Sequence, residues 1–180
     1  MKAQGMPIDD ATGEEGKRPA RPLFPIPSPI LRAVDGVNAL SERMIAGMLG
    51  ALVVLGSVQV VSRYLFSSPL TWTEEVIRYG LIWMVFLGSG VCTRKGALAT
   101  LDLVVMAVPD EVQFLFRWFV LLSAAAFWAV ICVFGHELAW NFSTLSGGTT
   151  GVSMGLIYAA IPIGALLSII NLIAAAADPR

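Results

Sequence analysis

The stretch TWTEEVIRYGLIWMVFLGSG, from Thr71 to Gly90, combines an apolar run with charges that hydrocarbon would reject: Glu74, Glu75 and Arg78. Its uncharged part, from Tyr79 to Thr93, is shorter than the roughly 20 residues that cross a ~30 Å hydrocarbon layer. We therefore predict a membrane span from about Trp72 to Thr93, and we place its charged first turns at the membrane interface, where charged side chains remain hydrated.

The composition of the whole chain points to lipid as its solvent. Hydrophobic residues make up 56% of the chain, charged residues only 14%, and the mean hydropathy is +0.74. Soluble domains carry about 25% charged residues. Three further segments contain no Asp, Glu, Lys or Arg and are long enough to cross a membrane: Met44–Ser62, Trp118–Gly135 and Gly151–Ala177. We predict an all-α integral membrane protein with four transmembrane helices.

Two parts of the chain precede the first span. Residues 1–29 mix charges with glycine and carry six prolines, a composition that cannot bury a core. We predict a disordered cytoplasmic tail over 1–29 and a membrane domain over 30–180. From Ser28-Pro29 onward, apolar residues recur at helical spacing (Ile30, Val34, Val37 and Leu40). This pattern predicts an amphipathic helix in the interface that turns into the membrane near Met44; the alternative is a simple extension of the first span.

The connections between spans have distinct signatures. The segment LATLDLVVMAVPDEV, residues 98–112, is apolar but too short to cross, and it contains Pro109. We predict a short interfacial or re-entrant segment there, with the third span beginning near Asp110, because acids favour a helix N-terminus. Turn residues fill NFSTLSGGTTG, residues 141–151, and predict a loop. Pro162 lies inside the fourth span, where it removes a hydrogen bond to the Tyr158 carbonyl and predicts a kink.

The distribution of lysine and arginine predicts the orientation. Ten lie before the first span, between the second and third spans, or at the C-terminus, and only Arg63 and Arg78 lie on the opposite side. Cytoplasmic loops carry the excess of Lys and Arg. We therefore expect a multi-pass protein of the cell inner membrane with both termini in the cytoplasm. No cleavable signal peptide precedes the first span, which is expected to remain in the mature protein.

This orientation places the charged start of the second span at the outer interface. Arg78 lies four residues after Glu74 and three after Glu75, so either acid can neutralise it on the helix surface. Arg63, at the end of the first span, is a second possible partner. A self-paired cluster and a docking site for another subunit both remain open. A proton-carrying carboxylate is disfavoured because no acid lies in the middle of a span.

Other chemistry finds little support in the sequence. His136 is the only histidine, so the chain cannot build a bis-histidine haem site by itself. Cys92 and Cys132 lack CxxC spacing, and the predicted helix directions place them too far apart to form a disulfide. We expect no enzymatic activity, no cofactor, no bound metal and no nucleic-acid partner.

The run WTEEVIRYGLIWMVFLGSGVCTRKGALATLDL, residues 72–103, resembles the small membrane subunit of TRAP (tripartite ATP-independent periplasmic) transporters, the DctQ-like proteins. In that family a W-x-E-E-x-x-R-Y block opens the second span and a basic-Gly segment followed by Asp closes it. The matching residues are Trp72, Glu74, Glu75, Arg78, Tyr79, Arg94, Gly96 and Asp102, and Tyr158, Pro162 and Gly164 match a Y-x-x-x-P-x-G ending. One departure is Leu98, where many members have histidine.

The resemblance implies a helper subunit. In the family, a large multispan subunit moves the substrate together with sodium, the small subunit widens its immobile scaffold, and a periplasmic binding protein delivers an organic acid, often a dicarboxylate. Together with the charged cluster described above, this gives the subunit-interface candidates of the chain: Arg63, Trp72, Glu74, Glu75, Arg78 and Tyr79.

Two rival classes remain open from the sequence. A small multidrug-type proton antiporter would need a membrane-embedded glutamate in its first span, where Gln59 is the only long polar residue. A membrane anchor of a respiratory complex would need histidine ligands for haem.

Overall fold

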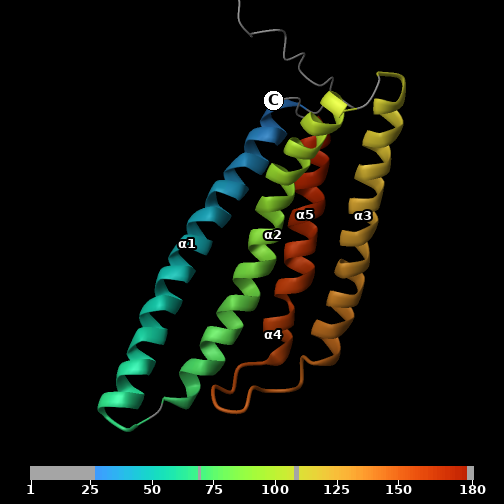
Figure 1. Cartoon of the computed structure of the whole chain (residues 1–180). Coiled ribbons are helices and arrows are strands. Elements are labelled where there is room, and N and C mark those ends of the chain that lie inside the picture. Colours follow the sequence, from blue (N-terminus) through green and yellow to red (C-terminus); the bar gives the residue numbers. More distant parts are fainter. Residues whose placement is uncertain (1–26, 69, 108–109, 178–180) are drawn as a thin grey trace, which may run out of the picture.

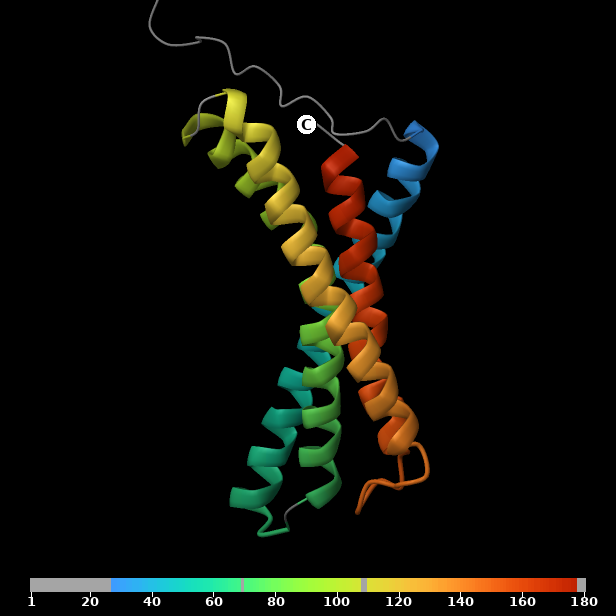
Figure 2. The same ribbon diagram turned by 90° about the vertical axis from the view of Figure 1, so that its right-hand side faces the viewer.

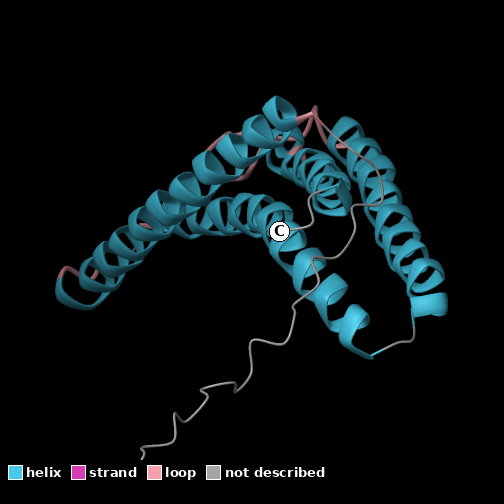
Figure 3. Cartoon of the chain, turned by 90° about the horizontal axis from the view of Figure 1, so that it is seen from above, coloured by secondary structure: helices cyan, strands magenta, loops and turns pink. Residues whose placement is uncertain are grey.

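The described part of the chain is built from helices and short loops. A computed structural model describes residues 27–68, 70–107 and 110–177, so most of the predicted 1–29 tail lies outside the described residues. The helices are α1 (Ser28–Leu65), α2 (Thr71–Ala107), α3 (Asp110–Asn141), α4 (Met154–Tyr158) and α5 (Ala160–Ala177) (Figure 1). Figure 3 shows the same helices from above, joined by short connections.

Four helical stretches are long and apolar enough to cross a membrane: Ser28–Leu65, Thr71–Gly96, Phe114–Asn141 and Met154–Ala177. They overlap the four predicted spans, so the prediction of an all-α protein with four membrane-spanning helices is confirmed at this level. The fourth stretch joins α4 to α5. We call the end of the bundle that carries the start of α1 and the end of α5 the terminal end, and the opposite end the loop end.

The helix α5 contacts each of the other four helices. It packs mainly against α2 and α3, whereas α1 packs mainly against α2, and α2 and α3 make few contacts with each other. The helices cross near their middles, so that α1 and α2 lie apart from α3 and α4 at the loop end (Figure 2). Each helix therefore leaves much of its apolar surface facing outward, as lipid or a partner subunit requires.

The first helix corrects the expectation of a turn near Met44. Ser28–Leu65 is one continuous helix of 38 residues, about 57 Å long at 1.5 Å per residue. No separate interfacial helix is seen, and the alternative, an extension of the first span, describes α1. The extension is tied to α2 by two ion pairs of 2.7 Å each, from Arg94 to Asp35 and from Lys95 to Glu42.

The segment at residues 98–112 is helical wherever it is described, and its placement at the interface stays a prediction. Residues 98–107 continue α2 without interruption, and α3 begins at Asp110, as the acidic start of the third span predicted. No proline interrupts α2 before Pro109, so the helix continues with its backbone hydrogen bonds formed within itself.

The predicted kink in the fourth span is confirmed. The helix stops at Tyr158 and resumes at Ala160, with Ala159 in a turn between α4 and α5. Pro162 has no N–H to donate to the Tyr158 carbonyl and interrupts the hydrogen-bond ladder there. The ladder resumes at the next residue, where the Ile163 N–H donates to the Ala159 carbonyl at 3.3 Å.

Small residues let α5 and α2 approach closely. A Cβ atom built on Gly164 would overlap the backbone carbonyl of Phe86, and one built on Gly90 would lie 2.7 Å from the Leu167 side chain. Near the terminal end, Leu121 of α3 packs with Leu172 and Ala176 of α5 in a buried apolar cluster. The contact between α2 and α5 thus depends on the absence of side-chain atoms at Gly164.

Candidate subunit-interface site at the loop end

The loop-end part of α2 uses Glu75 to hold the connection between α3 and α4. The Glu75 carboxylate accepts hydrogen bonds from the backbone N–H of Thr149 at 3.0 Å, from the backbone N–H of Thr150 at 3.0 Å and from the Thr150 hydroxyl at 2.8 Å. Hydrogen bonds to a carboxylate are among the stronger ones in proteins. Glu75 therefore anchors a loop more than seventy residues away in sequence.

Tyr79 supports the same loop from one turn further along α2. Residues four apart share a helix face, so Tyr79 follows Glu75 toward the loop. Its hydroxyl lies against Gly147, where an added Cβ atom would come within 2.5 Å of it. The backbone N–H of Gly147 in turn donates to the Val152 carbonyl at 2.8 Å and closes the loop on itself. Gly151 has a φ of +67°, a conformation that glycine adopts without strain.

Glu74 points to a different neighbour. Its carboxylate accepts a hydrogen bond of 3.0 Å from the side-chain amide of Gln59 on α1. In the described residues, neither Glu74 nor Glu75 forms an ion pair with Arg78 or Arg63. Of the two alternatives left open by the sequence, self-pairing is thus not seen in this part of the chain. Both carboxylates bond to partners on other elements, which helical spacing alone could not reveal.

The remaining candidates lie on the surface. Arg63, Trp72 and Arg78 are all exposed, and Trp72 retains 43% of its accessible surface. Arg78 lies within the candidate span Thr71–Gly96. The geometry thus divides the six predicted subunit-interface candidates into residues that hold the chain together and residues that remain exposed. Glu75 and Tyr79 fasten a loop, Glu74 joins α2 to α1, and three large side chains remain available to another molecule.

A buried polar network at the terminal end was not predicted. The Asn38 side chain on α1 and the Asn171 side chain on α5 exchange two hydrogen bonds, of 2.6 and 2.8 Å, and Asn171 also donates to the Gly90 carbonyl on α2 at 2.9 Å. Asn171 has no exposed surface. One feature of the sequence could have indicated it: Asn171 is the only amide or charged residue in the Met154–Ala177 stretch.

We expect Glu75→Gln to loosen the loop, because the carboxamide has one acceptor oxygen where the carboxylate has two. Backbone amide exchange at Thr149 and Thr150, followed by mass spectrometry of the purified chain, should become faster than in the unsubstituted protein. Glu74→Gln is the matched control, since Glu74 bonds to α1 and not to the loop; its loop exchange should stay unchanged. Equal exchange in all three proteins would contradict the anchoring role of Glu75.

Neither a metal centre nor a disulfide accompanies these contacts. Within the described ranges, no group of three or more His, Cys, Asp or Glu side chains could hold a metal ion. Cys92 and Cys132 are both free thiols.

Residues 52–179 match the family model described as "Tripartite ATP-independent periplasmic transporters, DctQ component". The chain belongs to the DctQ family. This DctQ protein is accordingly a small permease subunit of a TRAP transporter and not an enzyme. The resemblance first seen in the Trp72–Tyr79 block is confirmed.

Named relatives agree with the family. The DctQ chain is 27% identical over 139 residues to the sialic acid TRAP transporter permease protein SiaT of Haemophilus influenzae, covering 77% of this chain and 23% of SiaT. It is 26% identical to a provisionally named TRAP transporter small permease protein of the same species, covering 74% of this chain and 89% of that one. It is 24% identical to the C4-dicarboxylate small permease protein DctQ of Vibrio cholerae, covering 58% and 44%. The chain thus spans about a quarter of SiaT but most of the second relative.

Proposed function

We propose that this DctQ protein widens the stationary scaffold of a large multispan membrane subunit in the cell inner membrane. The large subunit would carry out sodium-coupled uptake of an organic acid, such as a dicarboxylate, that a periplasmic binding protein delivers. The small subunit would contribute surface and rigidity, while the substrate and sodium sites lie in its partner.

The observation that carries this proposal is that Arg78 is exposed near the start of a candidate membrane span, just before its uncharged part, and forms no ion pair with Glu74 or Glu75 in the described residues. A charged side chain is costly in hydrocarbon and is normally paired or faces protein. Glu74 and Glu75, the acids nearest to it in sequence, are bonded to Gln59 and to the loop. A partner subunit that offers an acid or carbonyl groups at this depth would satisfy Arg78.

The length of SiaT supports a large partner. Only 23% of SiaT corresponds to this chain, so the counterpart of the small subunit is joined there to a much longer permease polypeptide. The rest of SiaT is therefore an example of the kind of polypeptide with which we expect this chain to associate.

The relatives also bear on the substrate class. Their names give sialic acid in one case and C4-dicarboxylates in another, and both are carboxylates. This supports an organic acid as the substrate of the proposed transporter.

Co-expression tests the proposal directly. The tagged small subunit should recover a large multispan membrane protein, and vesicles holding both subunits should take up an organic acid only when sodium and the binding protein are supplied. Uptake by the small subunit alone would instead support a proton antiporter. Co-purified haem would support a respiratory anchor.

The orientation gives a separate prediction. In the described residues five Lys and Arg lie toward the terminal end (Arg32, Arg43, Arg94, Lys95 and Arg117), against Arg63 and Arg78 toward the loop end. We therefore expect the terminal end in the cytoplasm and the loop end in the periplasm. A reporter that works only in the cytoplasm should be active when it is fused after Arg180. A label within residues 143–149 should react from the periplasm. Cytoplasmic labelling of residues 143–149 would show that the orientation is reversed.

A further inference from the structure

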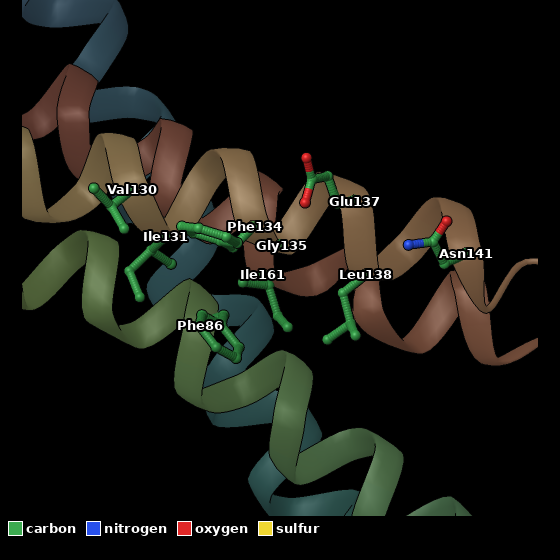
Figure 4. A pocket seen from close by; sticks show the side chains of 9 residues that line it. All are labelled: Phe86, Val130, Ile131, Phe134, Gly135, Glu137, Leu138, Asn141 and Ile161. Carbon is green, nitrogen blue, oxygen red and sulfur yellow. The ribbon is translucent and has the colours of Figure 1, made fainter.

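An open groove lies between α2 and α3 toward the loop end. Its cavity is about 440 Å³, within the ~300–1,000 Å³ range of ligand pockets. The groove exists because α2 and α3 both pack on α5 and make few contacts with each other. Ile161 of α5 lies between the two walls and packs against Gly135 of α3 (Figure 4).

The groove is apolar along most of its length and polar at one end. Phe86 of α2 faces Ile131 and Leu138 of α3 across the space between the helices. Glu137 and Asn141 belong to the last turns of α3 and line the rim, where the Glu137 side chain is exposed. A single carboxylate at the end of an apolar trough is a pattern that an amphipathic ligand with a cationic head would match.

The position of the groove along the span fits such a ligand. Asn141 is the last residue of the candidate span Phe114–Asn141, and Glu137 precedes it by about one turn. The rim therefore lies at the level of lipid headgroups, and the apolar part lies at the level of acyl chains. A bilayer lipid can enter sideways, because Val130 and Phe134 at the mouth are exposed.

The size of the groove favours an acyl chain over a helix. One turn of a helix of ~10 Å diameter and 5.4 Å pitch fills about 420 Å³. The cavity would therefore accept only about one turn of a helix. A flexible acyl chain can lie along the whole trough.

We propose that this groove is a site for a phospholipid with a primary-ammonium headgroup, with one acyl chain between α2 and α3 and the ammonium at the Glu137 carboxylate. A headgroup with only a phosphate charge would be repelled by Glu137, whereas an ammonium is attracted to it. The site is independent of the scaffold role proposed above, because it needs only the described helices and a bilayer.

Native mass spectrometry of the full-length chain tests the proposal. The protein, purified in mild detergent, is incubated with phosphatidylethanolamine or phosphatidylglycerol that carry identical acyl chains. Retention of phosphatidylethanolamine should exceed that of phosphatidylglycerol about fivefold, the ratio given by one exposed charge contact of about 1 kcal/mol. Glu137→Gln should bring the ratio close to one.

Two valines of α3 provide a matched pair for the apolar part. Val130 lines the groove and Val133 does not, although both are exposed. Val130→Trp should reduce the retention of both lipids, while Val133→Trp should retain them as the unsubstituted chain does, and thermal unfolding checks that both variants fold. Equal retention of the two lipids by the unsubstituted chain, or equal retention by the two tryptophan variants, would overturn the proposal.

A photo-crosslinking residue at position 130 in the assembled transporter separates lipid from protein. Crosslinks to phosphatidylethanolamine are expected. Crosslinks to a partner polypeptide in their place would show that a protein segment fills the groove, and would overturn the lipid site.

Discussion

Replacing Arg78 by alanine is expected to weaken association with the large subunit by a factor of about 150 to 5,000, and thereby to lower recovery of the complex and uptake. The exposed Arg78 guanidinium has no ion pair with Glu74 or Glu75. In the proposed complex it would therefore pair across the interface. Removing one member of a buried pair costs about 3–5 kcal/mol, because the other charge is left without compensation.

The measurement is affinity purification of the complex from membranes, together with uptake in vesicles. Arg43→Ala is a suitable control, because Arg43 is also an exposed arginine but lies on α1 toward the terminal end. The control should recover the complex normally. The affinity of the isolated periplasmic binding protein for its substrate should not change, since this chain contributes nothing to that site. If Arg78→Ala leaves both complex recovery and uptake normal, the docking role is rejected and Arg78 is an interfacial anchor.

The second large effect is expected at the terminal end, where Asn171→Ala should reduce the stability of the isolated chain by about 1–3 kcal/mol. Asn171 is fully buried and bonds to both α1 and α2. The substitution leaves the Asn38 side-chain amide buried without its partner, and a buried group without a partner bears its desolvation cost uncompensated. Thermal unfolding in detergent should show a lower midpoint.

A double-mutant cycle separates this effect from the cavity that alanine leaves. Asn38→Ala alone removes the partner of the Asn171 side chain on α1. In the double variant neither amide is left facing a missing partner. The double variant should therefore be less destabilised than the sum of the single variants by roughly 0.5–3 kcal/mol, the usual range for contacting residues. Strictly additive losses would mean that the two asparagines stabilise the chain independently of each other.

Much of the fold could be predicted from the sequence, because its decisive signals are local. Three charge-free runs and one apolar run with a charged start indicated the four spans. Asp110 marked the start of α3, and Pro162 marked the break between α4 and α5. The extent of α1 could not be predicted in the same way. An interfacial helix and an extension of the span have the same apolar periodicity, and what distinguishes them is the pairing of Asp35 and Glu42 with α2.

The site shows the same division. The Trp72–Tyr79 block could be located from its charges in an apolar run and from its resemblance to the family. Sequence spacing favoured contacts within the helix, yet Glu75 binds a loop more than seventy residues away. The pairing of Asn38 with Asn171 spans an even longer separation of 133 residues. Such contacts depend on how the helices pack, which neither periodicity nor local propensity specifies.

The close approach at Gly164 has a mechanical consequence. Where α5 meets α2 at Phe86, the glycine faces a backbone carbonyl and no side chain lies between them. Displacements between helices are usually absorbed by side chains that change rotamer, and here there is none to move. A push on the loop end of α5 would be passed to α2 at this point with little loss. In the proposed transporter, where the large subunit would move during transport, α2 and α5 would therefore resist displacement relative to each other at this crossing.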